Sequence, residues 1–515
     1  MEFPGILDLH KNPNEDVARP AFFLDLNIDQ IIERIDREWG EEVKSYFYFP
    51  ADRESEDYRR KVCYDIKQAG LFEPLCAFRN KMLDTVRCSE YREESVLSLQ
   101  KAVWAICEAT GYCEALSGLK AALEAANSQG LLQSEGMTML FGFLQDYMAG
   151  GEYQTLLVES RKLLDELNSL RIRMTYENNR VAVEAVDVKD AKELAPYEQF
   201  LRFFYKDNPK NLVTPFDDTV DLTKLERSVL AIFVKRRPEF FEAAERFEKS
   251  HRDFICKEFK QLTDDLSFYL SFRKFEIKLE KKGLCFCSPT VEEDKIIRAE
   301  GLYDFALACS MLDTLTQGSE SVVANDFYYN NDEQFFVLTG PNQGGKTTFA
   351  RSLGQLVYFT KMGLEVAAVS ANLHYFEDIL THFSVEESVE TGRGKLKEEL
   401  IRLAPMMEAK YDKSFVIINE LFTTAANYDA IIMGTNVLQH FIKQFCTGIY
   451  VTHLHELCEA DKAVTGICAM LDENGKQSFK ISRENIDYAE CAANQVNKHR
   501  LGYEQLKSRL GGLNG

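Results

Sequence analysis

Apolar residues recur at helical spacing through the first half of the chain and form short unbroken runs in the second half. From about residue 56 to 170, long amphipathic stretches with few prolines predict helices packed on helices. The stretch SLRIRMTYENNRVAVEAV then alternates with a period of two around residues 177–179, which predicts a small hairpin near 171–190. Helical spacing returns over 221–282, where Pro238 is expected to kink or split the helix.

The two helical runs allow two architectures. They can be the outgoing and returning arms of a lever, or they can belong to an ordinary bundle, and periodicity does not separate these alternatives. After Gly283 the pattern changes to short apolar strands alternating with helices, the strands being LCFCSP, FFVLT, SFVIIN and GIYVT. We therefore predict an N-terminal segment (1–55) packing on a helical core with lever arms (56–283), followed by an α/β nucleotide-binding domain (284–515) with C-terminal helices.

Composition narrows the class of protein. A chain of 515 residues with 45% apolar and 12% aromatic content is long enough for two to four domains with sizeable cores. Its formal net charge of -21 argues against a wholly basic nucleic-acid coat, although local contacts stay open. Thirteen cysteines without a C-x-x-C pair favour reduced core thiols over a metal site. The charged N-terminus and the lack of eighteen consecutive apolar residues predict a cytoplasmic protein with no membrane span.

The stretch FFVLTGPNQGGKTTFARS, residues 335–352, is typical of a phosphate-binding loop between a buried strand and a helix. Its residues Gly340, Gly345, Lys346 and Thr347 fit the pattern G-x-x-x-x-G-K-[ST]. Glycines let backbone N–H groups surround phosphates, the lysine reaches the terminal phosphates, and the threonine supplies a hydroxyl to Mg²⁺. The alternative is a glycine-rich turn that matches by chance, and the flanking strand and helix argue against it.

Two later strands end in polar residues at the edge where α/β sheets bind ligands. SFVIINELF delivers Asn419 and Glu420. A phosphate-loop ATPase usually has an acid for Mg²⁺ at the first position, so the neutral amide predicts weaker metal affinity. The glutamate is expected to activate water, the alternative being a strand-end carboxylate facing solvent. GIYVTHLHEL places His453 near the γ-phosphate, and the competing H-x-H-E zinc site lacks a third nearby ligand.

These motifs resemble those of the MutS mismatch-repair ATPases. TGPNQGGKTT is similar to the loop T-G-P-N-x-x-G-K-[ST]-T of that family. NELFTTAANYDA resembles D-E-x-G-R-G-T-S-T-Y-D-G, and VTHLHEL resembles A-T-H-x-x-E-L. The residues kept in these two motifs are Glu420, Tyr428, Asp429, His453, Glu456 and Leu457. The resemblance is strongest over residues 322–458, and the preceding helices fit the family's core and lever domain more loosely.

The resemblance implies an ABC-type P-loop ATPase domain that uses ATP and Mg²⁺ and works as a homodimer. Each nucleotide would lie between the phosphate loop of one subunit and a signature segment of the other, and the levers would encircle DNA. It assigns Glu420 and His453 to catalysis, and Thr347 and Asn419 to the metal. The residues expected to bind the nucleotide are Gly340, Pro341, Asn342, Gly344, Gly345, Lys346, Thr347 and Thr348.

The sequence departs from the family pattern at several places. VETGRGKLKEEL stands where the signature belongs, with Gly394 and Lys395 in place of hydroxyl residues. Val322 falls near the position of the aromatic residue that stacks on adenine, and residues 422–424 replace Gly-Arg-Gly. No N-terminal mismatch-reading domain or G-x-F-[YF]-E wedge is recognisable. We therefore expect binding to duplex or branched DNA that does not select mispairs.

Two functions remain as hypotheses. The first is a MutS-like protein that binds and hydrolyses ATP and couples nucleotide state to lever closure around DNA, in mismatch repair or related DNA-structure sensing. The second is a nucleotide-gated interaction protein with slow hydrolysis that grips a protein or ribonucleoprotein, and Asn419 and the acidic charge favour it. Basic stretches at 235–237 and 273–282 are candidate phosphate contacts, the alternative being solvated helix faces.

Overall fold

The chain divides into two compact units, each with its own core. The computed structural model describes residues 3–7, 18–48, 51–68, 70–169, 171–177, 180–186, 224–292, 297–313, 322–330, 332–384, 395–408, 413–472 and 476–483. Unit 1 consists of Met1–Ile6 and Asp65–Ser267, and unit 2 of Leu7–Tyr64 and Phe268–Gly515. Unit 1 is α-rich and unit 2 is α/β, so the predicted multidomain combination of the two classes is confirmed at that level.

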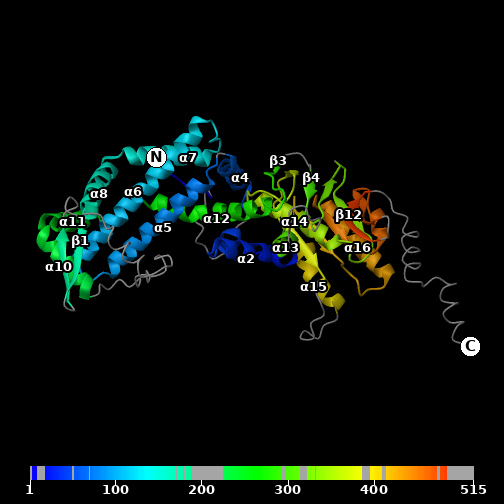
Figure 1. Ribbon diagram of the computed structural model, residues 1–515. Coiled ribbons are helices and arrows are strands. Elements are labelled where there is room, and N and C mark those ends of the chain that lie inside the picture. The colour runs from blue at the N-terminus through cyan, green and yellow to red at the C-terminus, as the bar shows by residue number, and fades with distance from the viewer. Residues whose placement is uncertain are drawn as a thin grey trace, which may run out of the picture. The chain divides into compact units, whose positions relative to one another are not determined.

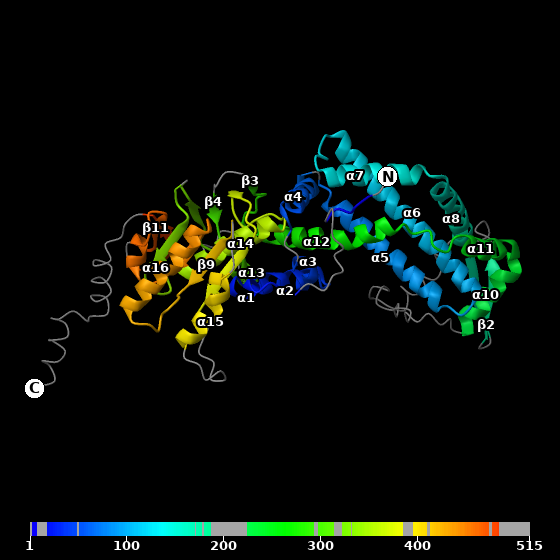
Figure 2. The same ribbon diagram turned by 180° about the vertical axis from the view of Figure 1, so that it is seen from behind.

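Unit 1 is built around one long helix, α6 (Ser98–Ser128), which packs against α5, α8 and α11 (Figures 1 and 2). Many of the residues that α6 buries are alanines, and small side chains let neighbouring helices approach closely. The other helices of this unit are α5 (Phe72–Glu94), α7 (Glu135–Ala149), α8 (Gly151–Ser169), α10 (Lys224–Arg236) and α11 (Pro238–Ser250). Helix α12 (Lys257–Glu280) contributes its first residues to unit 1 and the remainder to unit 2.

Two sequence patterns in unit 1 have direct structural counterparts. The alternating stretch forms an antiparallel hairpin of β1 (Arg171–Glu177) and β2 (Arg180–Val186). Pro238 separates two helices, because α10 ends at Arg236 and the proline opens α11 with Arg237 at its N-cap. Proline is well placed at the first helical position, where its missing N–H would have had no partner inside the helix.

A six-stranded sheet forms the centre of unit 2, in the order β12-β11-β6-β10-β9-β8. Its strands are β6 (Phe335–Thr339), β8 (Ile379–Phe383), β9 (Phe415–Asn419), β10 (Thr447–Val451), β11 (Val464–Leu471) and β12 (Gln477–Ser482). All neighbours are parallel except β11 and β12. Every residue of β6, β9 and β10 is buried, because helices cover both faces of a parallel sheet and each strand must be apolar throughout.

Different helices cover the two faces of this sheet. Helix α14 (Lys346–Lys361) lies against β8, β9 and β10 on one face. On the other face, alternate strand residues share a core with α15 (Lys395–Glu408), α16 (Asn427–Lys443) and η3 (His455–Glu459). A Cβ on Gly354 would lie 2.6 Å from atoms of both Ile417 and Leu26, so α14 can approach the sheet this closely only with glycine there.

The part of the N-terminal segment that belongs to unit 2 packs on α14. It contains α1 (Phe22–Asp25), α2 (Ile28–Trp39), α3 (Lys44–Phe47) and the first residues of α4 (Arg53–Gln68). Arg351 Nε donates a hydrogen bond to the Asp25 carbonyl at 2.9 Å, and Gln355 Nε2 donates to the Leu26 carbonyl at 3.0 Å. These bonds attach α1 and the residue after it to the helix that follows the glycine-rich loop.

A second sheet of four strands lies beside this core in unit 2, in the order β3-β7-β4-β5. Its strands are β3 (Thr290–Glu292), β4 (Ile297–Leu302), β5 (Asn325–Tyr328) and β7 (Ser370–His374), and α13 (Phe305–Met311) follows β4.

The prediction of a strand at LCFCSP is wrong. Only Cys287 pairs, in an isolated bridge with Val366, because the run meets no partner strand over its length. Among the described helices none is long and apolar enough to cross a membrane.

Candidate functional site

The glycine-rich loop follows β6 directly and ends where α14 begins at Lys346. Gly340 has φ +122° and Gly345 has φ +84°, values that favour glycine. A Cβ on Gly340 would also lie 3.0 Å from the backbone N and O of Ala469. Glycine at these two positions therefore lets the loop turn sharply at the end of a central strand and expose its backbone at a helix N-terminus.

Lys346 is folded back on the loop that precedes it. Its side chain is buried, and Nζ donates hydrogen bonds to the carbonyls of Gly340 at 2.8 Å and Pro341 at 3.0 Å. Burial lowers the pKa of Lys346, while the charge of Glu420 acts in the opposite direction. An anion bound at the loop would stabilise the protonated ammonium, so the arrangement suits a negatively charged ligand.

Thr347 and Asn419, the two residues predicted to bind metal, are brought together by the sheet. Thr347 Oγ1 donates a hydrogen bond to Asn419 Oδ1 at 3.1 Å, across from the first turn of α14 to the end of β9. Both offer neutral oxygens, which fit a hard cation such as Mg²⁺ but bring no charge of their own. Among the described residues no group of three or more His, Cys, Asp or Glu is arranged to hold a metal ion. His453, His455 and Glu456, the residues of the competing zinc site, therefore form no such group.

Glu420 and His453 are in contact at the same edge. His453 Nε2 lies 3.2 Å from Glu420 Oε1, with the imidazole N–H as donor, and the two side chains are 46% and 33% exposed. Glu420 directly follows β9, and one residue separates His453 from the end of β10; these strands are neighbours in parallel register. The contact positions a carboxylate and fixes the imidazole tautomer that faces it.

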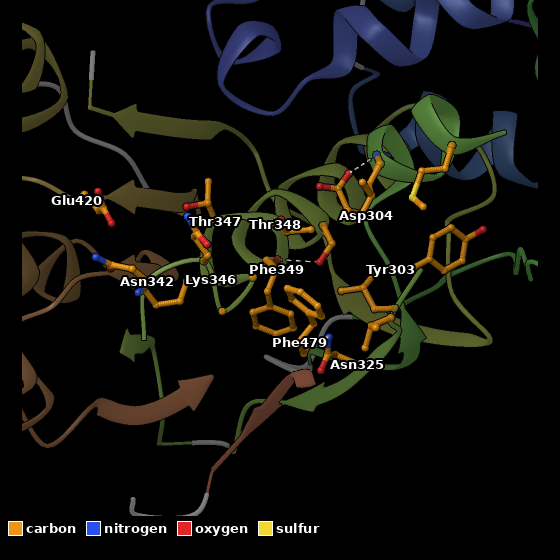
Figure 3. A pocket seen from close by; sticks show the side chains of 18 of the residues that line it. Tyr303, Asp304, Asn325, Asn342, Lys346, Thr347, Thr348, Phe349, Glu420 and Phe479 are labelled. Atoms are coloured by element: carbon orange, nitrogen blue, oxygen red, sulfur yellow. Dashed lines mark hydrogen bonds between the residues drawn. The ribbon is translucent and has the colours of Figure 1, made fainter. Parts of the chain in front are cut away.

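A cavity of about 730 Å³ joins these groups (Figure 3). At one end lie Lys346, Thr347 and Glu420, and toward the other end Figure 3 shows Tyr303 and Asp304. The lining includes all predicted loop residues except Gly340 and Pro341, whose carbonyls instead accept from the lysine. A lysine and a carboxylate at one end beside a partly apolar remainder suit a phosphorylated organic ligand.

Phe479 is a lining residue that the sequence did not reveal. It lies on β12, is 45% exposed, and its Cδ1 is 3.3 Å from the position of a Cβ on Gly345. Asn325 holds this strand, since its Nδ2 donates to the Phe479 carbonyl at 3.2 Å and its Oδ1 accepts from Ile481 N at 2.8 Å. The motif GKQSFKIS has no local feature that separates it from an ordinary strand, so only the pairing of β12 brings the ring to the loop.

The apolar end of the cavity is completed by side chains that precede the loop in sequence, namely Leu302, Leu307, Met311 and Val323. Val323 is next to the position where the family pattern has an aromatic residue. Gln343, with φ +62°, is a further lining residue that the motif did not single out. The segment resembling the signature, up to Gly394, lies outside the described residues, as do the C-terminal helices expected after residue 483.

The fold and the loop define an α/β protein in which a glycine-rich loop joins a buried parallel strand to a helix, with a carboxylate and an imidazole at the neighbouring strand ends. Residues 336–494 match the family model of MutS domain V. This match, together with the similarity to MutS and Msh proteins, supports a relationship to the MutS family.

Several DNA mismatch repair proteins are similar to it. MutS from Thermotoga sp. strain RQ2 is 24% identical over 360 residues, which cover 66% of this chain and 42% of that protein. Msh3 from Homo sapiens is 27% identical over 262 residues, or 50% of this chain and 22% of the relative. The protein msh-2 from Neurospora crassa is 29% identical over 143 residues, or 27% and 15%. The matches thus span less than half the length of these relatives.

Proposed function

We propose that the chain binds and hydrolyses ATP at the cavity beside the glycine-rich loop. The observation that carries this proposal is the combination of a buried lysine on the loop with the contact between Glu420 and His453 in one cavity. A phosphate-binding loop alone would support nucleotide binding only. A carboxylate held at the same cavity adds a group that can orient and deprotonate water.

Each residue has a defined part in this mechanism. Backbone N–H groups of the loop and the Lys346 ammonium bind the β- and γ-phosphates. Thr347 and Asn419 would hold Mg²⁺, which neutralises phosphate charge when bound. Glu420 accepts a hydrogen bond and then a proton from the attacking water. His453 orients that carboxylate and, as the strand-end imidazole, contacts the γ-phosphate. Phe479 and Val323 offer an apolar surface to the adenine ring of the nucleotide.

The ATPase activity is tested by steady-state phosphate release. Wild-type protein should release phosphate from ATP in a Mg²⁺-dependent way, and Glu420→Gln should bind ATP without releasing phosphate at a comparable rate. Glu459→Gln serves as a matched control, because this glutamate lies outside the cavity at the end of η3. Wild-type activity in Glu420→Gln would refute the assignment of Glu420 as the general base.

We further propose DNA as the partner and a homodimer as the working form. The support is the match to MutS domain V and the similarity to relatives that are DNA mismatch repair proteins. Binding of duplex, branched and single-stranded DNA should be measured with and without ATP over a salt series, because phosphate contacts give a salt-dependent affinity. Light scattering with and without ATP reports the oligomeric state.

Selectivity for mispairs is expected to be weak. Contacts to phosphates carry no base identity, and reading a mispair requires a group that enters the base stack. Competition between matched and mismatched duplexes of otherwise identical sequence measures this directly. A preference for the mismatch above about tenfold, or roughly 1.4 kcal/mol, would show that a wedge residue exists in the chain.

The second candidate function is a nucleotide-gated interaction protein with slow hydrolysis. The neutral amide of Asn419 beside Thr347 and the net charge of -21 favour it. This function predicts ATP binding, slow or absent phosphate release, and no ATP-dependent DNA affinity. The DNA-binding and phosphate-release measurements together separate the two functions.

A further inference from the structure

The turn that follows Glu420 is held in an uncommon backbone conformation. Glu420 has φ +55° and Phe422 has φ +63°, although neither is glycine. Such left-handed residues are strained, because Cβ approaches the backbone oxygen, and they persist only where the surrounding structure holds them. The direction in which the Glu420 side chain leaves the backbone therefore depends on the groups that hold this turn.

Three backbone N–H groups of the turn donate hydrogen bonds. Glu420 N donates to the Val451 carbonyl at 2.9 Å, and Ala425 N donates to the Phe422 carbonyl at 3.1 Å. Phe422 N donates to a side chain, Glu399 Oε2, at 3.2 Å. The first two bonds are made by the sheet and by the turn itself, whereas the third comes from a residue more than twenty positions earlier in the chain.

Glu399 is attached to the sheet through α15. Its backbone carbonyl accepts a hydrogen bond from His382 Nε2 at 3.3 Å, and Arg402 Nη1 of the next helical turn donates to the Phe383 carbonyl at 3.1 Å. His382 and Phe383 both belong to β8. The helix is thus fixed to the sheet at the level from which the Glu399 side chain reaches the turn after β9.

Burial of this carboxylate is costly unless it makes a specific contact. Glu399 is 4% exposed, and its neighbours include the apolar core residues Phe422 and Tyr450. Burial, with the Glu399 charge adding to it, raises the pKa of Tyr450. The buried Tyr450 hydroxyl has no hydrogen-bond partner among the described residues, so Glu399 bonds to the Phe422 amide and not to this hydroxyl.

We propose that Glu399 is a positioning residue that holds the turn after β9 and so directs the Glu420 carboxylate into the cavity. This inference rests on the proposed ATP hydrolysis. Glu399 is not among the residues that line the cavity, and it contacts the turn through a hydrogen bond to the Phe422 amide. Its loss should therefore change turnover and leave the affinity for ATP unchanged.

The test uses full-length variants at position 399. Glu399→Leu removes the acceptor and places an apolar side chain in the apolar core. Glu399→Met does the same with an unbranched side chain and replaces the leucine variant if that variant fails to fold. Both should lower kcat about tenfold or more, with the Kd for ATP within about threefold of wild type, because the hydrogen bond that holds the Phe422 amide is lost. Glu399→Gln keeps an oxygen that can accept from Phe422 N and should restore most of the turnover.

Amide hydrogen exchange supplies a readout that does not depend on activity. The peptide spanning residues 415–425 should exchange faster in Glu399→Leu, with the increase at the Phe422 amide, and should exchange as wild type in Glu399→Gln. Tyr450→Phe is the matched control in the same core. It removes a hydroxyl that has no hydrogen-bond partner in the described part of the chain, and it should change neither exchange at Phe422 nor kcat.

The outcomes are separable. Wild-type exchange at Phe422 in the leucine and methionine variants would overturn the inference, and so would unchanged kcat or a parallel loss of ATP affinity. Effects of Tyr450→Phe equal to those of Glu399→Leu would also overturn it, since any change in the core would then suffice. If wild-type protein hydrolyses no ATP, the proposed function fails, and the exchange measurement still decides whether Glu399 holds the turn.

Discussion

Replacing Lys346 with alanine tests the phosphate-binding role of the loop most directly. The ammonium is buried and donates two hydrogen bonds to loop carbonyls, at 2.8 and 3.0 Å. A single contact between an ion and a bound phosphate contributes about 1.5–3 kcal/mol as a charged hydrogen bond. Two unit charges about 4 Å apart interact by up to ~4 kcal/mol near a protein surface. We therefore expect Lys346→Ala to weaken ATP binding by about 2–4 kcal/mol, or roughly 30- to 1,000-fold.

Isothermal titration with ATP and ADP measures this loss, and the exposed Lys462, which lies outside the cavity, gives a control variant with the same change of charge. Lys346→Met distinguishes the charge from the packing of the side chain, because it keeps an apolar stem of similar length. Both variants should lose affinity, and Lys462→Ala should not. An ATP affinity of Lys346→Ala within about threefold of wild type would refute the assignment of the loop.

The same lysine gives a pH dependence. Burial lowers its pKa in the free protein, and a bound phosphate would raise it again. Between these two pKa values, binding takes up a proton, so ATP affinity should fall as pH rises through the lowered pKa toward the usual value of about 10.4. Titrations in buffers of different ionisation enthalpy report the proton uptake. This pH dependence should be absent from Lys346→Met.

Three further substitutions are expected to have distinct effects. Glu420→Gln should leave ATP affinity within a few-fold and slow phosphate release by about 10²–10⁴, measured in a single turnover, because an amide does not accept the proton. Asn419→Asp should lower the Mg²⁺ concentration for half-maximal activity, since a carboxylate still accepts from Thr347 and adds a charge, and a higher requirement would contradict the metal assignment. Burial and the charge of Arg402 lower the pKa of His382. In the unfolded chain this histidine therefore takes up a proton at a higher pH than in the folded protein. As pH falls below about 6.5, the free energy of unfolding should decrease by up to ~1.4 kcal/mol per pH unit through this site. Urea unfolding at several pH values measures this decrease, which should be missing in His382→Gln.

The sequence predicted the charged end of the cavity because each of its parts is local. A strand, a glycine turn and a helix follow one another within eighteen residues, and the residues after β9 and β10 reach the same edge because parallel strands end together. Knowing only that these strands are parallel neighbours, one can expect Glu420 and His453 to be close. Their hydrogen bond, at 3.2 Å, adds a detail that spacing does not contain.

The apolar end was not predictable in the same way. Phe479 reaches the loop because β12 pairs antiparallel with β11, which pairs with β6, and no pattern within β12 encodes that order. The attachment of α1 to α14 also depends on partners more than three hundred residues apart in sequence. LCFCSP failed as a strand for the related reason that an apolar run becomes a strand only when another strand pairs with it along its length.

The geometry of the turn after β9 bears on the choice between hydrolysis and gating alone. Gating by nucleotide requires the loop and a metal site, and neither depends on the direction of the Glu420 side chain. The chain nevertheless holds Glu420 and Phe422 in the left-handed region, at about 1–3 kcal/mol each, and places a buried carboxylate to bond the Phe422 amide. If Asn419 holds Mg²⁺, its neutral amide is expected to lower the affinity for the metal without altering this arrangement of Glu420. The two effects are therefore independent, and raising Mg²⁺ should increase the rate of a hydrolysing protein toward a plateau set by Glu420, whereas a gating protein would show saturable ATP binding with no such increase.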